Sequence, residues 1–184
     1  MERREHDPSL PLTSITAAEG VIDRELVERR DTSPEDKSSY KVIRPGDIGY
    51  NTMRMWQGVS GLSTLNGIVS PAYTVVVPVP ERMDAKFAAH LFKAPEMVHR
   101  FWRYSQGLVD DTLQLKFKHF AEIEIALPPV EEQSRMATRL DIGRSELALL
   151  DSFVATLRLQ KRGLMQTLLT GERQLSAGMS EAAA

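Results

Sequence analysis

The stretch from Pro128 to Gly171, PPVEEQSRMATRLDIGRSELALLDSFVATLRLQKRGLMQTLLTG, dominates this sequence. Pro129 suits the first turn of a helix, where its missing N–H costs nothing, and Glu131 and Glu132 suit the positive end of the helix dipole. Gly171 is a typical residue just beyond a helix end. The stretch therefore predicts one long helix of roughly 60 Å at about 1.5 Å per residue.

Apolar residues recur along this helix every 3.5 residues, the period of a coiled coil. The a positions are Leu140, Leu147, Val154 and Leu168, and the d positions are Met136, Leu150, Leu157 and Leu164. Only Gly143 and Lys161 interrupt this seam. A helix that packs on its own domain normally has a wider apolar stripe. The seam favours pairing with another helix, and folding back on the same domain stays as the alternative.

The two interruptions indicate the direction of the partner helix. A parallel pair would set Lys161 against its copy and leave a void between two glycines. An antiparallel pair centred near Ser152 instead places Gly143 opposite Lys161, where the lysine stem can cross the space and reach water. Leu147 then meets Leu157, and the other apolar positions also find apolar partners. The sequence therefore predicts an antiparallel helix pair.

Composition limits the remaining possibilities. The chain has 184 residues, which leaves room for one globular domain of about 125 residues beside the helix. The N-terminus, MERREHDPSL, carries both charge signs, and no apolar run could span a membrane, so we expect a cytoplasmic protein with no membrane partner. The absence of cysteine excludes disulfides and thiolate metal sites. At a net charge of −2, a DNA-binding surface must be a local patch.

The first part of the chain reads mostly as strands and turns. PLTSIT (11–16) predicts a short strand, and YKVIRPGDIGYNTMRMW (40–56) predicts a β-rich run broken by a tight turn at Pro45-Gly46-Asp47. Asn66-Gly67 is a strong local cue for a hairpin. After it, IVSPAYTVVVPVP (68–80) predicts a buried strand interrupted by Pro71.

The middle of the chain predicts helices and then a last strand. Residues 83–105 predict two short helices split at Pro95, whose inward residues are Phe87, Leu91, Val98, Phe101 and Trp102. AEIEIAL (121–127) alternates and predicts a strand that leads into the long helix. The expected fold class is α+β: a small mixed α/β domain over 1–127, a coiled-coil helix over 128–171 and a disordered tail over 172–184.

Three segments together resemble one half of the specificity (S) subunit of a type I restriction-modification system. They are 40–78, with RPGDIGYNTMRMWQG and NGIVSPAYTVVVP; 105–117, SQGLVDDTLQLKF; and 123–172, with IEIALPPVEEQ and LLTGE. The resemblance implies a target recognition domain that reads a short DNA half-site. It also implies a conserved spacer helix that pairs antiparallel and docks the methyltransferase (M) subunit.

Two departures from the family pattern carry further expectations. Members of the family usually have two recognition domains and two spacer helices, whereas this sequence has one of each. The departure implies a half-subunit that pairs with a second copy or with another S chain. The segment that normally precedes a strand such as PLTSIT is missing, so we expect an N-terminally incomplete domain. The resemblance places methylation and cleavage in M and restriction (R) subunits that bind S-adenosylmethionine, ATP and Mg, with no cofactor in this chain.

Candidate DNA contacts are polar or basic side chains at expected turns and helices. Arginine reads guanine edges in the major groove, and asparagine or glutamine reads adenine edges. Candidates between the GDIGYN strand and the next turn are Asn51, Arg54, Trp56 and Gln57. Candidates for phosphate contacts are Arg100, Arg103, Lys116 and Lys118. For each of them an ordinary surface role stays open, such as Arg54 stacked on Trp56.

Two other functions stay open. A truncated S fragment would pair and dock the methyltransferase without reading DNA. A metal-dependent nuclease is the weaker alternative, suggested by Asp110-Asp111 with His119 nearby. Adjacent carboxylates on a strand or turn usually diverge, and the sequence has no metal-ligand spacing and no phosphate-binding glycine loop. We therefore predict no catalytic residue and no metal site.

Overall fold

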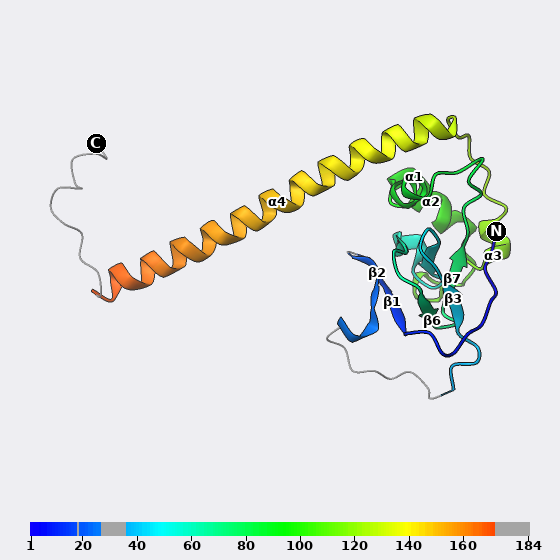
Figure 1. Cartoon of the computed structure of the whole chain (residues 1–184), viewed down its shortest axis with the longest axis horizontal. Helices are drawn as coiled ribbons and strands as arrows, with labels where there is room; N and C mark the ends of the chain where they lie inside the picture. The colour runs from blue at the N-terminus through cyan, green and yellow to red at the C-terminus, as the bar shows by residue number, and fades with distance from the viewer. Residues whose placement is uncertain (18, 27–35, 172–184) are drawn as a thin grey trace. The chain divides into compact units, whose positions relative to one another are not determined.

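The structure is a computed structural model that describes residues 1–17, 19–26 and 36–171 (Figure 1). It divides into two compact units, Met1–Thr138 and Arg139–Ala184. We call the first unit the head. The expected disordered tail, 172–184, lies outside the described residues.

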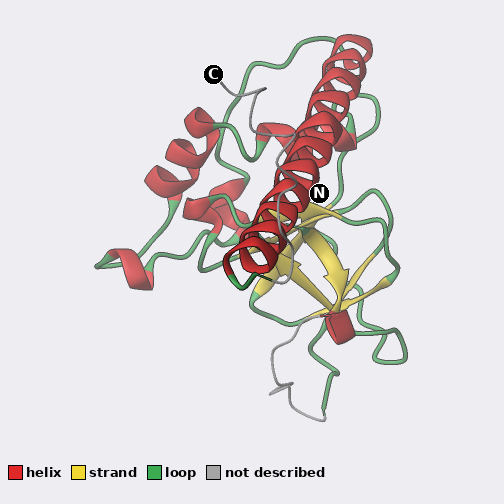
Figure 2. Cartoon of the chain, turned by 90° about the vertical axis from the view of Figure 1, so that its left-hand side faces the viewer, coloured by secondary structure: helices red, strands yellow, loops and turns green. Residues whose placement is uncertain are grey.

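Short antiparallel strands form the β part of the head. The strands are β1 (Thr13–Thr16), β2 (Gly20–Asp23), β3 (Lys41–Ile43), β4 (Ile48–Asn51), β5 (Ser60–Leu62), β6 (Gly67–Val69) and β7 (Tyr73–Val76). β1 pairs with β2, β3 pairs with β6, and β4 lies between β5 and β7. In Figure 2 the strands lie together, with most of the short helical segments to one side. The predicted break at Pro45-Gly46-Asp47 falls between β3 and β4, as expected.

The predicted hairpin at Asn66-Gly67 is wrong. β5 and β6 flank this pair in sequence but do not pair with each other, because β6 pairs with β3. Gly67 serves a close approach instead, since a Cβ there would lie 2.7 Å from the carbonyl oxygen of Pro11 and 2.6 Å from Cγ2 of Thr13. The glycine marks a crowded strand start, and the sequence alone does not distinguish that role from a turn.

The N-terminal residues run along the sheet and are held there by a partly buried ion pair. Glu2 forms an antiparallel bridge with Val76 of β7. Next to it, Arg3 donates to both carboxylate oxygens of Asp47, with Nε 2.7 Å from Oδ2 and Nη2 2.9 Å from Oδ1. The hydrogen bond to Asp47 raises the pKa of Arg3. Asp47 also accepts the backbone N–H of Arg44. A turn aspartate thus ties two distant segments together.

The α-helices of the head follow its strands in sequence, whereas two of its 3-10 turns lie between strands. The helices are α1 (Ala85–Leu91), α2 (Pro95–Tyr104) and α3 (Phe117–Phe120), with 3-10 turns η1 (Arg24–Leu26), η2 (Met55–Gln57) and η3 (Asp110–Thr112). The predicted split at Pro95 is confirmed, because Pro95 begins α2. Asp84 caps α1 by accepting the N–H of Phe87 at 2.8 Å.

The predicted inward position of Trp102 is wrong. Trp102 is 46% exposed and stacks on His99, whereas Phe101 and Met97 are buried. Residues 97 and 101 lie one turn apart on the same face of α2, so the face that they define turns Trp102 outward. Phe87, Leu91 and Val98 are half-buried.

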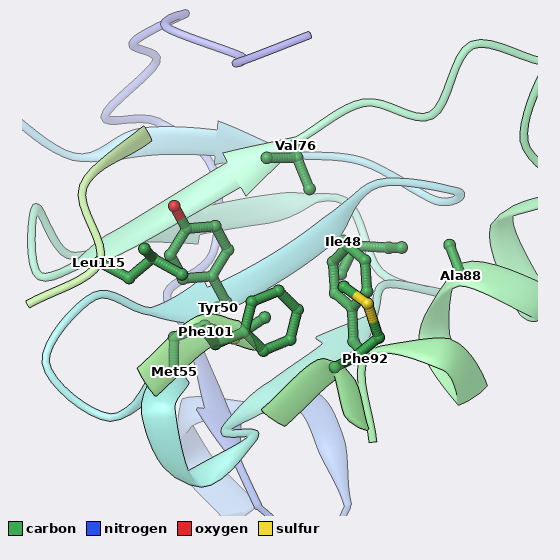
Figure 3. Close-up of a cluster of buried hydrophobic side chains, with 9 residues drawn as sticks. Ile48, Tyr50, Met55, Val76, Ala88, Phe92, Phe101 and Leu115 are labelled. Carbon is green, nitrogen blue, oxygen red and sulfur yellow. The ribbon is translucent and has the colours of Figure 1, made fainter. Parts of the chain in front are cut away.

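The main core lies on one face of β4 (Figure 3). Ile48 and Tyr50 point into it, and Tyr50 stacks on Phe120 with ring centroids 5.4 Å apart. Gly49 points to the opposite face, where a Cβ would collide with Cδ1 of Ile15. A second cluster fills that face and consists of Ile15, Val21, Ile43, Val69 and Val75. The central strand therefore separates two apolar layers.

The predicted last strand, AEIEIAL over 121–127, is also wrong. Residues 123–129 have no strand pairing, although Ile123 and Ile125 pack against the main core and Glu124 is exposed. The alternation thus reported which side is buried. Alternation does not show whether another strand lies alongside to form the backbone hydrogen bonds of a sheet.

The predicted long helix is confirmed as α4 (Val130–Leu169), which has 40 residues. Its bounds lie within two residues of those expected from Pro128-Pro129 and Gly171. Together with the small strands of the head, it confirms the expected α+β class. Among the described helices, none is long and apolar enough to cross a membrane.

Candidate nucleic-acid interface and helix seam

The first group of candidate DNA contacts surrounds η2, directly after the central strand. Met55 is fully buried and fixes this turn, while Arg54 and Gln57 on either side are exposed. Trp56 donates its Nε1–H to the carbonyl oxygen of Met53 at 3.0 Å. Arg54 and Gln57 are therefore the side chains that the turn presents to solvent, whereas Trp56 makes a hydrogen bond within the turn.

Asn51 has a local role in the same turn. It is the last residue of β4, and its Oδ1 accepts the N–H of Met53 at 2.9 Å. This contact is a side-chain turn of the kind that asparagine commonly makes. Its amide nitrogen is the part that could still reach a base edge.

The second group comes from α2, which packs against η2. Arg100 and Arg103 are both exposed. Arg100 also donates from Nη1 to the carbonyl oxygen of Glu124 at 2.8 Å, so it holds the extended segment that precedes α4. Arg103 lies in the last turn of α2, where a cation complements the helix dipole. Arg103 is thus the better candidate for a phosphate contact.

The third group, Lys116 and Lys118, lies at the start of α3 and lines a hollow of about 480 Å³. The hollow also brings in Arg4 and Lys41, which sequence reasoning did not select. The only signal for Arg4 in the sequence is the basic pair in MERREH, because its position depends on the pairing of residue 2 with residue 76. We call this cavity the basic hollow.

The helix seam is solvent-exposed in the single chain. The exposed fractions are Met136 39%, Leu140 50%, Leu147 64%, Leu150 59%, Val154 42%, Leu157 45%, Leu164 50% and Leu168 38%. A Cβ at Gly143 would meet nothing within 4 Å, and Lys161 is exposed. The space that the antiparallel arrangement requires at Gly143 is thus open. The pairing itself stays a prediction.

Sequence reasoning missed the role of Gln133, which is completely buried in the head. Its Oε1 accepts the N–H of Asp84 at 3.0 Å, and its Nε2 donates to the carbonyl oxygens of Arg82 at 3.0 Å and Pro128 at 2.8 Å. Ala137, one turn further along α4, is also buried. The only signal in the sequence is that Gln133, the last residue of LPPVEEQ, lies four positions before the small residue Ala137. The first two turns of α4 therefore belong to the packing of the head.

The residues that suggested a nuclease are described only in part. Asp111 is exposed, and Nδ1 of His119 lies 3.6 Å from Oε2 of Glu122. Throughout residues 1–17, 19–26 and 36–171, no group of three or more His, Cys, Asp or Glu side chains could hold a metal ion.

Two solved structures are similar to this chain. The first is the HsdS subunit from Thermoanaerobacter tengcongensis, with a TM-score of 0.58 and 24% identity, over 75% of this chain and 37% of that chain. The second comes from work on the structural basis of complex assembly and conformational transition of the type I R-M system. It has a TM-score of 0.55 and 22% identity, over 80% of this chain and 39% of that chain. No family model and no curated protein matches the sequence.

At these identities the likeness shows a shared fold. The resemblance to S subunits that the sequence motifs indicated is therefore confirmed at the level of the fold. The chain spans well under half the length of each of the two structures that it matches.

Proposed function

We propose that this chain is a DNA specificity subunit of a type I restriction-modification system. In this proposal the head reads a DNA half-site, and the chain itself performs no catalysis. The methyltransferase and restriction subunits supply methylation and cleavage in the cytoplasm, with S-adenosylmethionine, ATP and Mg. Among the residues selected from the sequence, the exposed candidates for DNA contacts are Arg54, Gln57, Arg100, Arg103, Lys116 and Lys118.

The single observation that carries the proposal is the combination of two features in one chain. One is the fold shared with HsdS. The other is a 40-residue helix whose exposed leucine seam has no cover in the single chain. A recognition head alone would not need that helix. A head joined to a pairing helix is what a half-subunit needs if it is to hold two heads on one DNA molecule.

The helix then acts as a spacer between two half-sites. A two-fold pair of identical chains recognises an inverted repeat, because its symmetry is imposed on the DNA. Inserting one heptad into α4 should widen the gap between half-sites by roughly 10 Å, or about 3 base pairs. Methylation mapping with the lengthened chain measures the gap. An unchanged gap would show that the helix does not set the spacing.

The direct test is genome-wide methylation mapping in cells that carry the methyltransferase, with and without this chain. We expect a bipartite methylated motif that disappears when the gene is deleted. A gel-shift assay of the co-expressed chain and methyltransferase complements it. Assembly without retention of any duplex would indicate the alternative, a fragment that docks the methyltransferase and reads no DNA.

A further inference from the structure

The basic hollow has a charge that sets it apart from the chain as a whole. Its lining includes four cations, Arg4, Lys41, Lys116 and Lys118, and one carboxylate, Glu2, so its formal charge is 4 − 1 = +3. The complete chain has a net charge of −2. A concave surface of one sign concentrates ions of the opposite sign.

The five charged side chains differ in how strongly the protein already engages them. Glu2 lies 2.7 Å from Nη2 of Arg4 and 3.6 Å from Nζ of Lys41. Lys41 also donates to the carbonyl oxygen of Tyr73. Lys116 and Lys118 are exposed, and within the described part of the chain neither forms an ion pair. Two of the cations are therefore available to an anion without loss of an existing pair.

The hollow is continuous with the turn that carries the candidate base contacts. Thr52 and Met53 line the hollow and directly follow Asn51. The hydroxyls of Thr52 and Thr74, which both line it, lie 3.2 Å apart. Phosphate contacts fix the register of a protein on DNA, whereas base contacts select the sequence. A phosphate site beside the η2 turn would thus place base edges within reach of that turn.

We infer that the basic hollow binds phosphate groups of the DNA backbone, so that Arg4 in the N-terminal segment forms part of the DNA-binding surface. The inference rests on the proposed function and adds to it a phosphate site that includes Arg4 and Lys41. At about 480 Å³ the hollow exceeds a single phosphate and has room for the adjoining sugars. Glu2 lowers the affinity of the site, because it holds Arg4 and Lys41 and repels the phosphate.

The test measures binding of the full chain to a fluorescein-labelled duplex of random sequence by anisotropy, over a series of salt concentrations. A random duplex suffices because phosphate contacts do not depend on sequence. Lys116→Gln and Lys118→Gln should each weaken binding and reduce the slope of log K against log salt by about 0.9. Arg162→Gln, a loss of one positive charge on the exposed side of α4, is the control and should change neither quantity.

Glu2→Gln provides the test with the opposite sign. It should tighten binding severalfold, because it releases two cations, and a misfolded variant would not bind more tightly. The inference is overturned if Glu2→Gln leaves the affinity unchanged or if the lysine variants behave like Arg162→Gln. It is also overturned if AMP or polyglutamate binds the hollow of the wild-type chain while Lys116→Gln leaves duplex binding intact.

Failure of the proposed function gives a different result. In that case the wild-type chain binds no duplex, either alone or with its methyltransferase, and the inference fails with it. Wild-type binding that none of the hollow variants alters overturns only the inference. Thermal unfolding followed by circular dichroism establishes that each variant is folded.

Discussion

The head and the long helix treat apolar side chains in opposite ways. In the head, Ile43, Ile48, Tyr50 and Phe101 are at most 1% exposed. Between residues 139 and 169, every Leu, Ile, Val, Phe and Met side chain is at least 38% exposed. Burial of one such side chain is worth about 1.5–3 kcal/mol. The head therefore contains its own source of stability, whereas the helix exposes surface that another molecule could cover.

The largest expected effect is on dimerisation, and it should differ between two adjacent leucines of the helix, Leu149 and Leu150. Leu150→Asp puts a charge in the proposed seam and should cost several kcal/mol of pairing free energy, which abolishes the dimer at micromolar concentration. Leu149→Asp is the matched control, because residue 149 lies outside the a and d positions and should leave the dimer intact. Sedimentation equilibrium measures both. A wild-type chain that is already monomeric, or equal effects of the two substitutions, would contradict the pairing.

The next effect concerns the point where the helix belongs to the head. Gln133→Leu removes three hydrogen bonds and leaves Asp84 N–H and the carbonyls of Arg82 and Pro128 without partners. We expect a loss of about 3 kcal/mol in the free energy of unfolding of the head. Urea unfolding followed by tryptophan fluorescence measures it. Gln160→Leu, on an exposed part of α4, should change this free energy little.

A smaller effect is expected at the ion pair of the N-terminal segment. Arg3→Met leaves the nearly buried carboxylate of Asp47 without its cation and should reduce the free energy of unfolding by about 2 kcal/mol. Arg4→Met is the control, since the side chain of Arg4 is 77% exposed and its pair with Glu2 contributes little. Equal losses for the two variants in urea unfolding would show that the Arg3–Asp47 contact is not special.

The smallest effect concerns the buried hydroxyl of Tyr50, which lies near Thr74 but forms no hydrogen bond of good geometry within the described part of the chain. Burial raises the pKa of Tyr50 well above its usual range. The unfolded chain therefore loses this proton first, so stability should fall as the pH rises above about 10. Tyr50→Phe should be neutral at pH 7, within about 1 kcal/mol, and should weaken the alkaline loss. Tyr104→Phe is the control, and unfolding of each variant is measured at pH 7 and at a pH above about 10.

The helix could be predicted from sequence because its signals are local. Pro129, the acidic first turn and Gly171 fix its ends, and the 3.5-residue period needs only the chain itself. The two short helices around Pro95 could be predicted for the same reason. Local signals also placed the turn at Pro45-Gly46-Asp47 between two strands.

The wrong and missing predictions concern residues whose roles depend on contacts with distant parts of the chain. Gly67 looks like a turn residue and is a glycine because Pro11 and Thr13 crowd it. The alternation of 121–127 reports a buried side but not a neighbouring strand. Arg4 joins Lys116 at the basic hollow only through the pairing of the N-terminal segment with β7. No local pattern contains these contacts, so the candidate site was found only in part.

The buried amide of Gln133 has a consequence for engineering. Its three partners belong to the head, and Ala137 packs there as well, so the natural boundary for recombination falls after Thr138, within the helix. A hybrid joined at Pro128 would combine the head of one parent with the first two turns of α4 from the other parent, so Gln133 and its partners would come from different proteins. Chimeras that exchange heads should therefore carry the first two helical turns along with them.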